Sequence, residues 1–306
     1  MTLNELRYIV ALARERHFGR AAETAFISQP TLSVAVKKLE DELGVHLFER
    51  AKHEVTPTPV GERIIEQAQA VLESVQRIRE TARGDFDQLH GPLRLAAIYT
   101  IGPYLLPNLI PELHDRAPEM PLMIEEGYTH ELRRRLKQGE VDAILIALPF
   151  EEPGVVTLPL YDEPFVAVLP TTHPLALQQD VALTELAGAD FLMLGQGHCF
   201  RDQVIEYCPE CGRSVSAEGH AALIGSSLET LRHMVASGLG VTVLPCTAVG
   251  ADRYAQRLLA VRRLKSPTPS RRVALAWRVS FPRPKAIEVL RQAIHTCPMS
   301  CVTSVE

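Results

Sequence analysis

The sequence predicts an α+β protein of two domains: a winged helix-turn-helix joined by a long linker helix to an α/β domain. Three observations support this fold class. Helical periodicity fills the first part of the chain, a narrow apolar stripe follows, and strand-like runs then alternate with amphipathic helical ones. The expected boundaries are residues 1–60 for the winged helix-turn-helix, 61–91 for the linker helix and hinge, and 92–306 for the α/β domain.

Composition is that of an ordinary globular protein, with 46% hydrophobic and 23% charged residues. The formal net charge of −5 offers no bulk attraction for nucleic acid, so any DNA contact must be local. The first residues lack the apolar core of a signal peptide, and no run reaches the length of a membrane span. We therefore expect a cytoplasmic protein without membrane contact, whose six cysteines are reactive, metal-binding or inert rather than structurally paired.

Three helices are predicted at the amino terminus. Apolar residues recur at helical spacing over residues 3–13, and a short alanine-rich helix follows over residues 19–25. The third helix begins after Ser28, a suitable N-cap, carries Pro30 in its first turn, and closes at Gly44. Such a pair of helices with a tight turn is the helix-turn-helix layout, in which the second helix enters the major groove.

The third helix combines a polar front with an apolar interior of Leu32, Val36 and Leu39. Two short strands, at 45–50 and 54–59, predict a wing where Arg50 and Lys52 could meet phosphate. A three-helix packing module without nucleic acid is the alternative, but it does not account for the polar front. The predicted DNA-contacting residues are Ser28, Gln29, Pro30, Thr31, Ser33, Lys37 and Arg50.

This module also carries a characteristic series of short runs: Phe18-Gly19-Arg20-Ala21-Ala22, Ser28-Gln29-Pro30-Thr31-Leu32-Ser33, Leu39-Glu40, Leu43-Gly44, Leu47-Phe48-Glu49-Arg50 and Thr58-Pro59-Val60-Gly61. Together they resemble the LysR-type transcriptional regulators. The resemblance implies binding to double-stranded DNA and an effector domain similar to periplasmic binding proteins, with two subdomains around a cleft. It also implies a tetramer and possible contact with RNA polymerase.

The linker segment places Ile64, Ala68, Val71, Val75 and Ile78 at 4-3-4-3 spacing, a seam of period 3.5 on an otherwise polar helix. Two such helices would pair, which predicts a homodimer through the linker. The alternative is a helix packed on its own chain.

From residue 93 onward the pattern predicts an α/β domain with mostly parallel sheets. Thr100 follows one strand and Thr129 begins a helix after another, so their hydroxyls could face a shared cleft. Spacing alone favours ordinary helix-start residues. The predicted strands are 93–98, 122–126, 141–147, 165–169, 191–194, 241–244 and 273–279, and the helices are 106–116, 129–138, 227–238 and 284–295.

One cysteine has the surroundings of a reactive thiol. Cys199 follows His198 and precedes Arg201 by two residues, and nearby positive charge favours the thiolate. If residues 200–207 are helical, Cys199 and Cys208 lie roughly 13 Å apart, beyond the 4.4–6.8 Å that a disulfide spans between Cα atoms. Oxidation would then have to unwind the segment. The alternative is a small buried apolar residue with chance neighbours.

The segments 197–203, 227–231 and 234–238, together with Cys208, resemble the peroxide-sensing members of the LysR-type family. This resemblance implies that Cys199 is oxidised to a sulfenic acid, and that Cys208 resolves it to a disulfide. It also implies that Thr100, Thr129, His198 and Arg271 bind hydrogen peroxide, although the alignment around Arg271 is ambiguous by one position. No cofactor or metal is required. The alternatives are a regulator of this family with an organic effector, or a thiol peroxidase-like enzyme.

Cys211 departs from a two-cysteine scheme, since Cys208-Pro209-Glu210-Cys211 places a third thiol beside the resolving one. A Cys-x-x-Cys pair can be half a zinc site, completed by His198, Cys199 or His220, though only two ligands have firm spacing. We expect Cys199–Cys208 as the main disulfide, with Cys211 able to substitute slowly or to exchange with Cys208. Cys246 is expected to serve packing, and no role is predicted for Cys297 or Cys301.

Overall fold

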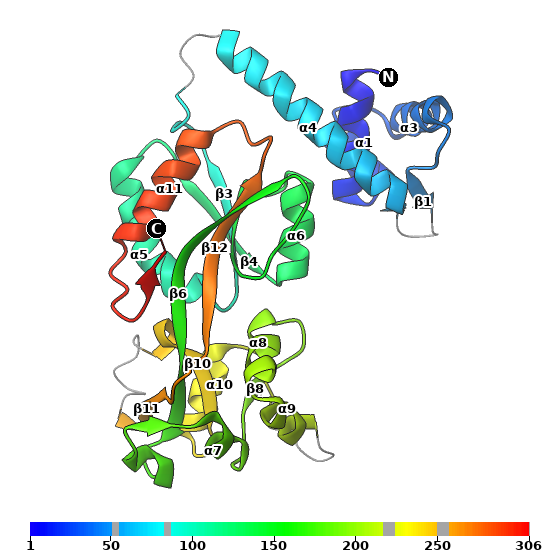
Figure 1. Cartoon of the computed structure of the whole chain (residues 1–306). Helices are drawn as coiled ribbons and strands as arrows, with labels where there is room; N and C mark the ends of the chain where they lie inside the picture. The colour runs from blue at the N-terminus through cyan, green and yellow to red at the C-terminus, as the bar shows by residue number, and fades with distance from the viewer. Residues whose placement is uncertain (51–54, 83–86, 217–223, 250–256, 306) are drawn as a thin grey trace.

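The computed structural model describes residues 1–50, 55–82, 87–216, 224–249 and 257–305 (Figure 1). A helical amino-terminal domain is followed by one long helix, and the rest of the chain forms two lobes joined by long strands. Within the described part of the chain, none of the helices combines the length and apolarity needed to cross a membrane.

The amino-terminal domain contains α1 (Leu3–Glu15), α2 (Phe18–Thr24) and α3 (Gln29–Leu43). Local signals fix where α3 starts and stops. The Ser28 side chain accepts a hydrogen bond from the Thr31 amide at 3.3 Å, and Gly44 ends the helix with φ of 69°. The helix-turn-helix prediction is confirmed.

The wing is a two-stranded antiparallel ribbon of β1 (Phe48–Arg50) and β2 (Val55–Pro57), shorter than the predicted strands. Phe48 and Val55 are buried in the core of the domain, together with Leu32, Val36 and Leu39 as predicted. Lys52 lies outside the described residues.

The linker is α4 (Pro59–Ala82), 24 residues long. The start of the predicted seam packs within the chain, because Ala68 is buried against the amino-terminal core and Ile64 is partly buried there. Farther along, Val71 is 43% exposed and Ile78 is 68% exposed. The apolar surface available to a second copy therefore lies in the second half of α4.

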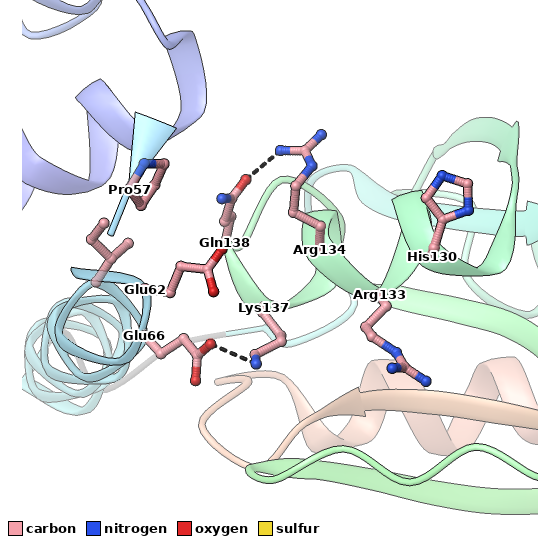
Figure 2. A pocket seen from close by; sticks show the side chains of 9 residues that line it. Pro57, Glu62, Glu66, His130, Arg133, Arg134, Lys137 and Gln138 are labelled. Carbon is pink, nitrogen blue, oxygen red and sulfur yellow. Dashed lines mark hydrogen bonds and ion pairs between the residues drawn. The ribbon is translucent and has the colours of Figure 1, made fainter. Parts of the chain in front are cut away.

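Side chains of α4 also contact the following domain. Glu73 is buried and accepts a hydrogen bond at 2.7 Å from Arg278, whose other donors bind the carbonyl oxygens of Leu136, at 2.5 Å, and Val141, at 2.7 Å. Lys137 bridges to Glu66 at 2.6 Å across the small pocket in Figure 2. These ion pairs attach the linker helix to its own effector domain.

Lobe I contains three parallel strands flanked by helices, with β3 (Leu93–Ile98) paired to both neighbours. The remaining elements of lobe I are β4 (Leu122–Gly127), β5 (Ala143–Ala147), α5 (Gly102–Arg116), α6 (Thr129–Lys137) and α11 (Pro284–Thr296). The helix predicted at 106–116 begins four residues earlier, with Pro103 near its amino terminus, where proline is tolerated.

Two long strands, β6 (Val155–Pro170) and β12 (Ser270–Arg278), run between the lobes (Figure 1). β12 pairs antiparallel with β5 and with the first part of β6, while β10 (Thr242–Pro245) and β11 (Leu259–Leu264) pair antiparallel with the second part of β6. The prediction of mostly parallel sheets is therefore wrong, because the strands that connect the lobes return antiparallel. The predicted strand 165–169 is only the end of β6.

Lobe II has its own hydrophobic core, separate from that of lobe I. Its elements are β7 (Asp180–Val181), α7 (Leu183–Ala187), β8 (Met193–Leu194), α8 (Cys199–Tyr207), α9 (Pro209–Ser216), β9 (Ile224–Gly225), α10 (Leu228–Ala236), β10 (Thr242–Pro245) and β11 (Leu259–Leu264), with short 3-10 helices η1 (Pro174–Leu177) and η3 (Cys246–Val249). A terminal strand, β13 (Thr303–Ser304), returns to β6. Two lobes with separate cores confirm the predicted pair of subdomains.

Candidate functional site

Cys199 is the first residue of α8 and lies between the two lobes. Its helix belongs to lobe II, yet the half-buried Cys199 side chain packs against the core of lobe I. The fold therefore places a free thiol at the boundary between the lobes.

His198 precedes the helix and contacts two aromatic rings of lobe I. Its ring lies 4.9 Å from that of Tyr128 and 6.0 Å from that of Tyr99. A side chain at Gly197 would meet the Tyr128 ring at 3.2 Å, and its φ of 95° also favours glycine. These contacts bring Tyr99 and Tyr128 of lobe I against the residues that precede α8.

Burial lowers the pKa of His198, and a hydrogen bond to the Ser226 backbone acts in the opposite direction. The lowered pKa keeps the imidazole neutral at neutral pH. Arg201 donates a hydrogen bond to the Leu194 carbonyl at 2.8 Å. The lowered pKa disfavours the positive charge that the sequence pattern placed on His198 beside the thiol.

Thr129 is the first residue of α6, directly after Tyr128. Its Oγ1 atom is buried and has no hydrogen-bond partner among the described residues. Buried hydroxyls in folded proteins nearly always find a partner. The Thr129 hydroxyl is therefore available to a polar ligand or a water molecule.

Arg271 lies inside the protein, in a charged cluster that joins both lobes. Its guanidinium donates to Glu163 at 2.7 Å, to the Thr100 hydroxyl at 2.8 Å and to the Thr100 carbonyl at 2.7 Å. The same guanidinium lies 5.5 Å from the centre of the Phe200 ring, next to Cys199. Arg272 points the other way and pairs with Asp162 on the surface. The buried arginine at this end of β12 is Arg271.

Cys208 lies at the other end of α8 and forms a disulfide with Cys211, with 5.4 Å between the Cα atoms, while Cys199 is a free thiol. The pairing in this structure thus differs from the expected Cys199–Cys208 bond. The reason is local: α8 is intact and keeps Cys199 and Cys208 at its opposite ends. Cys208 and Cys211 meet across the short turn between α8 and α9.

A second disulfide joins Cys246 to Cys301 and ties the carboxy-terminal tail to η3. The expectation that Cys246 serves only packing is wrong, as is the expectation that the cysteines are not paired. Cys297 is a buried free thiol whose pKa burial raises to about 11. That thiol is poorly suited to react near neutral pH.

The disulfide also bears on the zinc hypothesis, since both sulfur atoms of Cys208 and Cys211 are bonded to each other. Across the described ranges, no group of three or more His, Cys, Asp or Glu side chains is arranged to hold a metal ion. His220, one of the proposed ligands, lies outside those ranges.

Most of the predicted DNA-contacting residues lie at the start of α3, Lys37 lies in its middle, and Arg50 lies in the wing. Their exposure fits a reading face, apart from Ser33, which is half-buried. Arg50 ends β1, and its side chain is outside the described part. The exposed members are Ser28, Gln29, Pro30, Thr31 and Lys37.

Comparison with known proteins identifies the family. Residues 3–62 match the bacterial regulatory helix-turn-helix model of the lysR family, and residues 86–297 match the LysR substrate-binding domain. The chain belongs to the LysR family. The DNA-binding transcriptional dual regulator OxyR of Escherichia coli K12 is 40% identical to this LysR protein over 295 residues, or 96% of this chain and 95% of the relative.

Solved structures extend the comparison to the whole fold. Full-length OxyR C199D from Pseudomonas aeruginosa is 56% identical, covers 100% of this LysR protein and 99% of its own chain, and superposes with a TM-score of 0.87. An H2O2-bound cysteine mutant of OxyR from Corynebacterium glutamicum is 35% identical, covers 97% and 92% of the two chains, and has a TM-score of 0.64.

Sequence patterns missed three residues of the charged cluster in this LysR protein. Glu163 is fully buried opposite Arg271, and the backbone amide of Thr247 donates to it at 3.2 Å. Phe200 places its ring under the guanidinium. The sequence does hold a signal for Glu163: side chains alternate along a strand, so a neighbour of the partly exposed Asp162 is expected to point inward. Thr247 follows a strand and carries no such signal.

Proposed function

We propose that this LysR-family regulator senses hydrogen peroxide through Cys199 and converts oxidation into a change of DNA binding. The observation that carries the proposal is the position of Cys199: a free, half-buried thiol at the first residue of α8, packed against the core of lobe I. The OxyR relatives are described as hydrogen peroxide-inducible gene activators, which supports the same conclusion.

The first chemical step is nucleophilic attack by the Cys199 thiolate on one peroxide oxygen. The O–O bond breaks, Cys199 becomes a sulfenic acid, and the other oxygen leaves as water after taking a proton. A thiol at Cys208 then attacks the Cys199 sulfur, forming the disulfide and releasing a second water. Two thiols and one peroxide thus give one disulfide and two waters.

The proposed peroxide contacts use different properties of four side chains. Thr129 has a free buried hydroxyl, and neutral His198 can donate or accept a hydrogen bond. Arg271 carries donors only, so the Thr100 hydroxyl accepts from it and the hydroxyl proton remains available for a peroxide oxygen. The cluster thereby presents donors to a leaving oxygen.

Formation of the Cys199–Cys208 bond must open α8, which packs Phe200 and Val204 into the core of lobe II. The resulting rearrangement would change how the lobes, and the linker helices attached to them, present two DNA-binding domains. We propose that the exposed half of the α4 seam forms the homodimer and that dimers pair into a tetramer. RNA polymerase is a further proposed partner of the DNA-bound form.

Thiol mapping tests the redox proposal. The reduced protein is treated with one equivalent of peroxide, alkylated and digested, and the disulfides are identified by mass spectrometry. Wild type should lose the free thiol of Cys199 first, and Cys199→Ser should abolish both the disulfide and the peroxide-dependent change in DNA footprint. Normal switching by Cys199→Ser would contradict the proposal.

Two other functions make different predictions. A regulator with an organic effector would switch DNA binding without any change in thiol content. A thiol peroxidase-like enzyme would consume many equivalents of peroxide at low protein concentration with excess reductant, at rates comparable to dedicated peroxidases.

DNA reading by α3 is tested by substitution on its exposed face. Gln29→Ala should weaken specific binding by about 1–3 kcal/mol and leave binding to random DNA nearly unchanged, because base-edge contacts discriminate between sequences. Arg50→Ala should weaken both, as expected of a phosphate contact. Equal losses on specific and random DNA for Gln29→Ala would place the reading face elsewhere.

Dimer formation is tested at the seam. Replacing the exposed Val71 and its neighbour Val75 by Glu should place like charges across the helix pair and lower the mass measured by light scattering. Unchanged mass would mean that the copies associate through another surface.

A further inference from the structure

We propose that Cys211 ends the peroxide signal by thiol–disulfide exchange. The inference rests on the proposed function, because it starts from the Cys199–Cys208 disulfide. The Cys211 thiolate attacks the Cys208 sulfur, the Cys199–Cys208 bond breaks, and Cys199 leaves as a thiolate while Cys208–Cys211 forms. One disulfide replaces another, so the exchange needs neither a reductant nor an oxidant.

The exchange is favoured toward the Cys208–Cys211 disulfide because only that bond is compatible with a folded α8. A bond between Cys199 and Cys208 requires the helix to open, since its two ends are roughly 13 Å apart when it is formed. The Cys208–Cys211 bond coexists with a complete α8 and a complete α9. Exchange therefore lets α8 refold and return Phe200 and Val204 to the core, where they are 2% and 4% exposed.

The turn between the helices favours attack by Cys211 over attack by a distant thiol. Pro209 opens α9, and the Cys211 amide donates a hydrogen bond to the Cys208 carbonyl at 3.1 Å, which holds the two residues together. Loop closure between residues three apart involves few rotations, so the exchange is effectively a local reaction.

Burial of the product also favours this outcome. When Cys199 is expelled, α8 can re-form. The product pair is sealed from solvent, with Cys208 1% exposed and Cys211 completely buried.

Two functional consequences follow. The activated state lasts only as long as Cys211 takes to attack, so the protein produces a timed response to peroxide. Afterwards Cys199 is again a thiol but Cys208 is not free to resolve it. A second peroxide would then leave a persistent sulfenic acid at Cys199. The structure has the bonding expected after exchange, with Cys199 free and Cys208 bonded to Cys211.

The test follows one peroxide equivalent through the full-length protein. Fully reduced wild type and Cys211→Ser are oxidised, and samples are alkylated at intervals and mapped by peptide mass spectrometry. Wild type should form Cys199–Cys208 transiently and then Cys208–Cys211, with Cys199 again open to alkylation. In Cys211→Ser the Cys199–Cys208 bond should last at least about ten-fold longer, and the altered DNA footprint should last equally long.

Controls address folding and the other thiols. Cys211 is fully buried, so Cys211→Ala is run alongside the serine variant, with circular dichroism of both. Cys297 is a buried free thiol with no part in the proposed exchange, so Cys297→Ser should follow the wild-type time course. The Cys246–Cys301 pair is quantified in the same digests, so that oxidation there is not counted as exchange.

Two results would overturn the inference while leaving the proposed function intact. One is an equal lifetime of Cys199–Cys208 in wild type and in both Cys211 variants. The other is formation of Cys208–Cys211 in Cys199→Ser as fast as in wild type, which would show direct oxidation. Failure of the proposed function looks different, since Cys211→Ser would then form no Cys199–Cys208 bond, and the exchange would lose its starting point as well.

Discussion

The two ends of α8 differ in access and in bonding. At the amino-terminal end, Cys199 is a half-buried free thiol between the lobes. At the carboxyl end, Cys208 is buried and bonded to Cys211. The proposed site of oxidation is thus partly open to solvent, whereas the proposed resolving thiol is buried in the core. The two thiols of the proposed disulfide are separated by the length of one helix.

Both ends of α8 nevertheless rest on the same short part of β12. Phe200 near the first end lies beneath Arg271, and the Tyr207 hydroxyl at the second end donates to the Ser270 carbonyl at 3.2 Å. The opposite end of β12 carries Arg278, which binds Glu73 of the linker helix. Opening α8 would thus disturb a strand whose far end holds the helix that leads to the DNA-binding domain.

The largest expected effect comes from removing the buried charge that supports the amino-terminal end of α8. Arg271→Met should destabilise the protein by about 3–5 kcal/mol, because Glu163 is left charged in the interior. Arg272→Met is the matched control, since its pair with Asp162 lies on the surface and should contribute little to stability. Urea unfolding measures both.

A double variant separates lost charge from lost packing. Adding Glu163→Gln to Arg271→Met removes the stranded carboxylate and should recover part of the stability. If Arg271→Met and Arg272→Met lowered the free energy of unfolding by the same small amount, the buried cluster would not anchor α8. The two ends of the helix would then not differ in how they are stabilised.

A smaller effect is expected from changing the cost of opening the helix itself. Asp202 is exposed near the middle of α8. Glycine there is less favourable in a helix than alanine by about 1 kcal/mol, so Asp202→Gly should form the Cys199–Cys208 bond about five-fold faster than Asp202→Ala. The rate of disulfide formation in each variant is measured by quenching the oxidation at intervals and mapping the thiols by mass spectrometry.

The pair is matched because both variants remove the same carboxylate. The rate at which Cys199 becomes a sulfenic acid should be equal in the two, since that step precedes opening of the helix. Equal rates of disulfide formation would show that α8 does not have to unwind, which would remove the distinction between its ends.

Local signals explain why the amino-terminal domain was predicted well. The Ser28 cap, Pro30 and Gly44 define both ends of α3, and the apolar spacing selects its buried face. The helix after Cys199 was considered only as a possibility from its local pattern, and the structure contains it as α8. The family resemblance, rather than periodicity, pointed to Thr100, Thr129 and Arg271.

The remaining features depend on contacts between distant parts of the chain. Glu163 meets Arg271 only because β6 and β12 pair across more than a hundred residues. Cys246 and Cys301 are brought together by the return of the tail along β6. The neutral state of His198 follows from burial against Tyr99 and Tyr128. None of these environments is encoded within a window of neighbouring residues.

The smallest expected effect is a pH dependence confined to the amino-terminal end of α8. Burial lowers the pKa of His198 in the folded protein, so the unfolded chain binds more protons once the pH falls below the ordinary histidine range. This contribution to stability is fully present above about pH 6.5 and is lost as the pH falls through the lowered pKa.

His198→Asn removes the titrating ring, so the stability difference between wild type and variant should shrink as the pH drops from neutral. Urea unfolding at several pH values measures that difference, and His198→Gln should repeat it if titration rather than side-chain shape is the cause. A difference that is independent of pH would mean that the imidazole does not change charge on unfolding. The carboxyl end of α8 provides the contrast, since Cys208 and Cys211 are bonded and have no thiol proton to exchange.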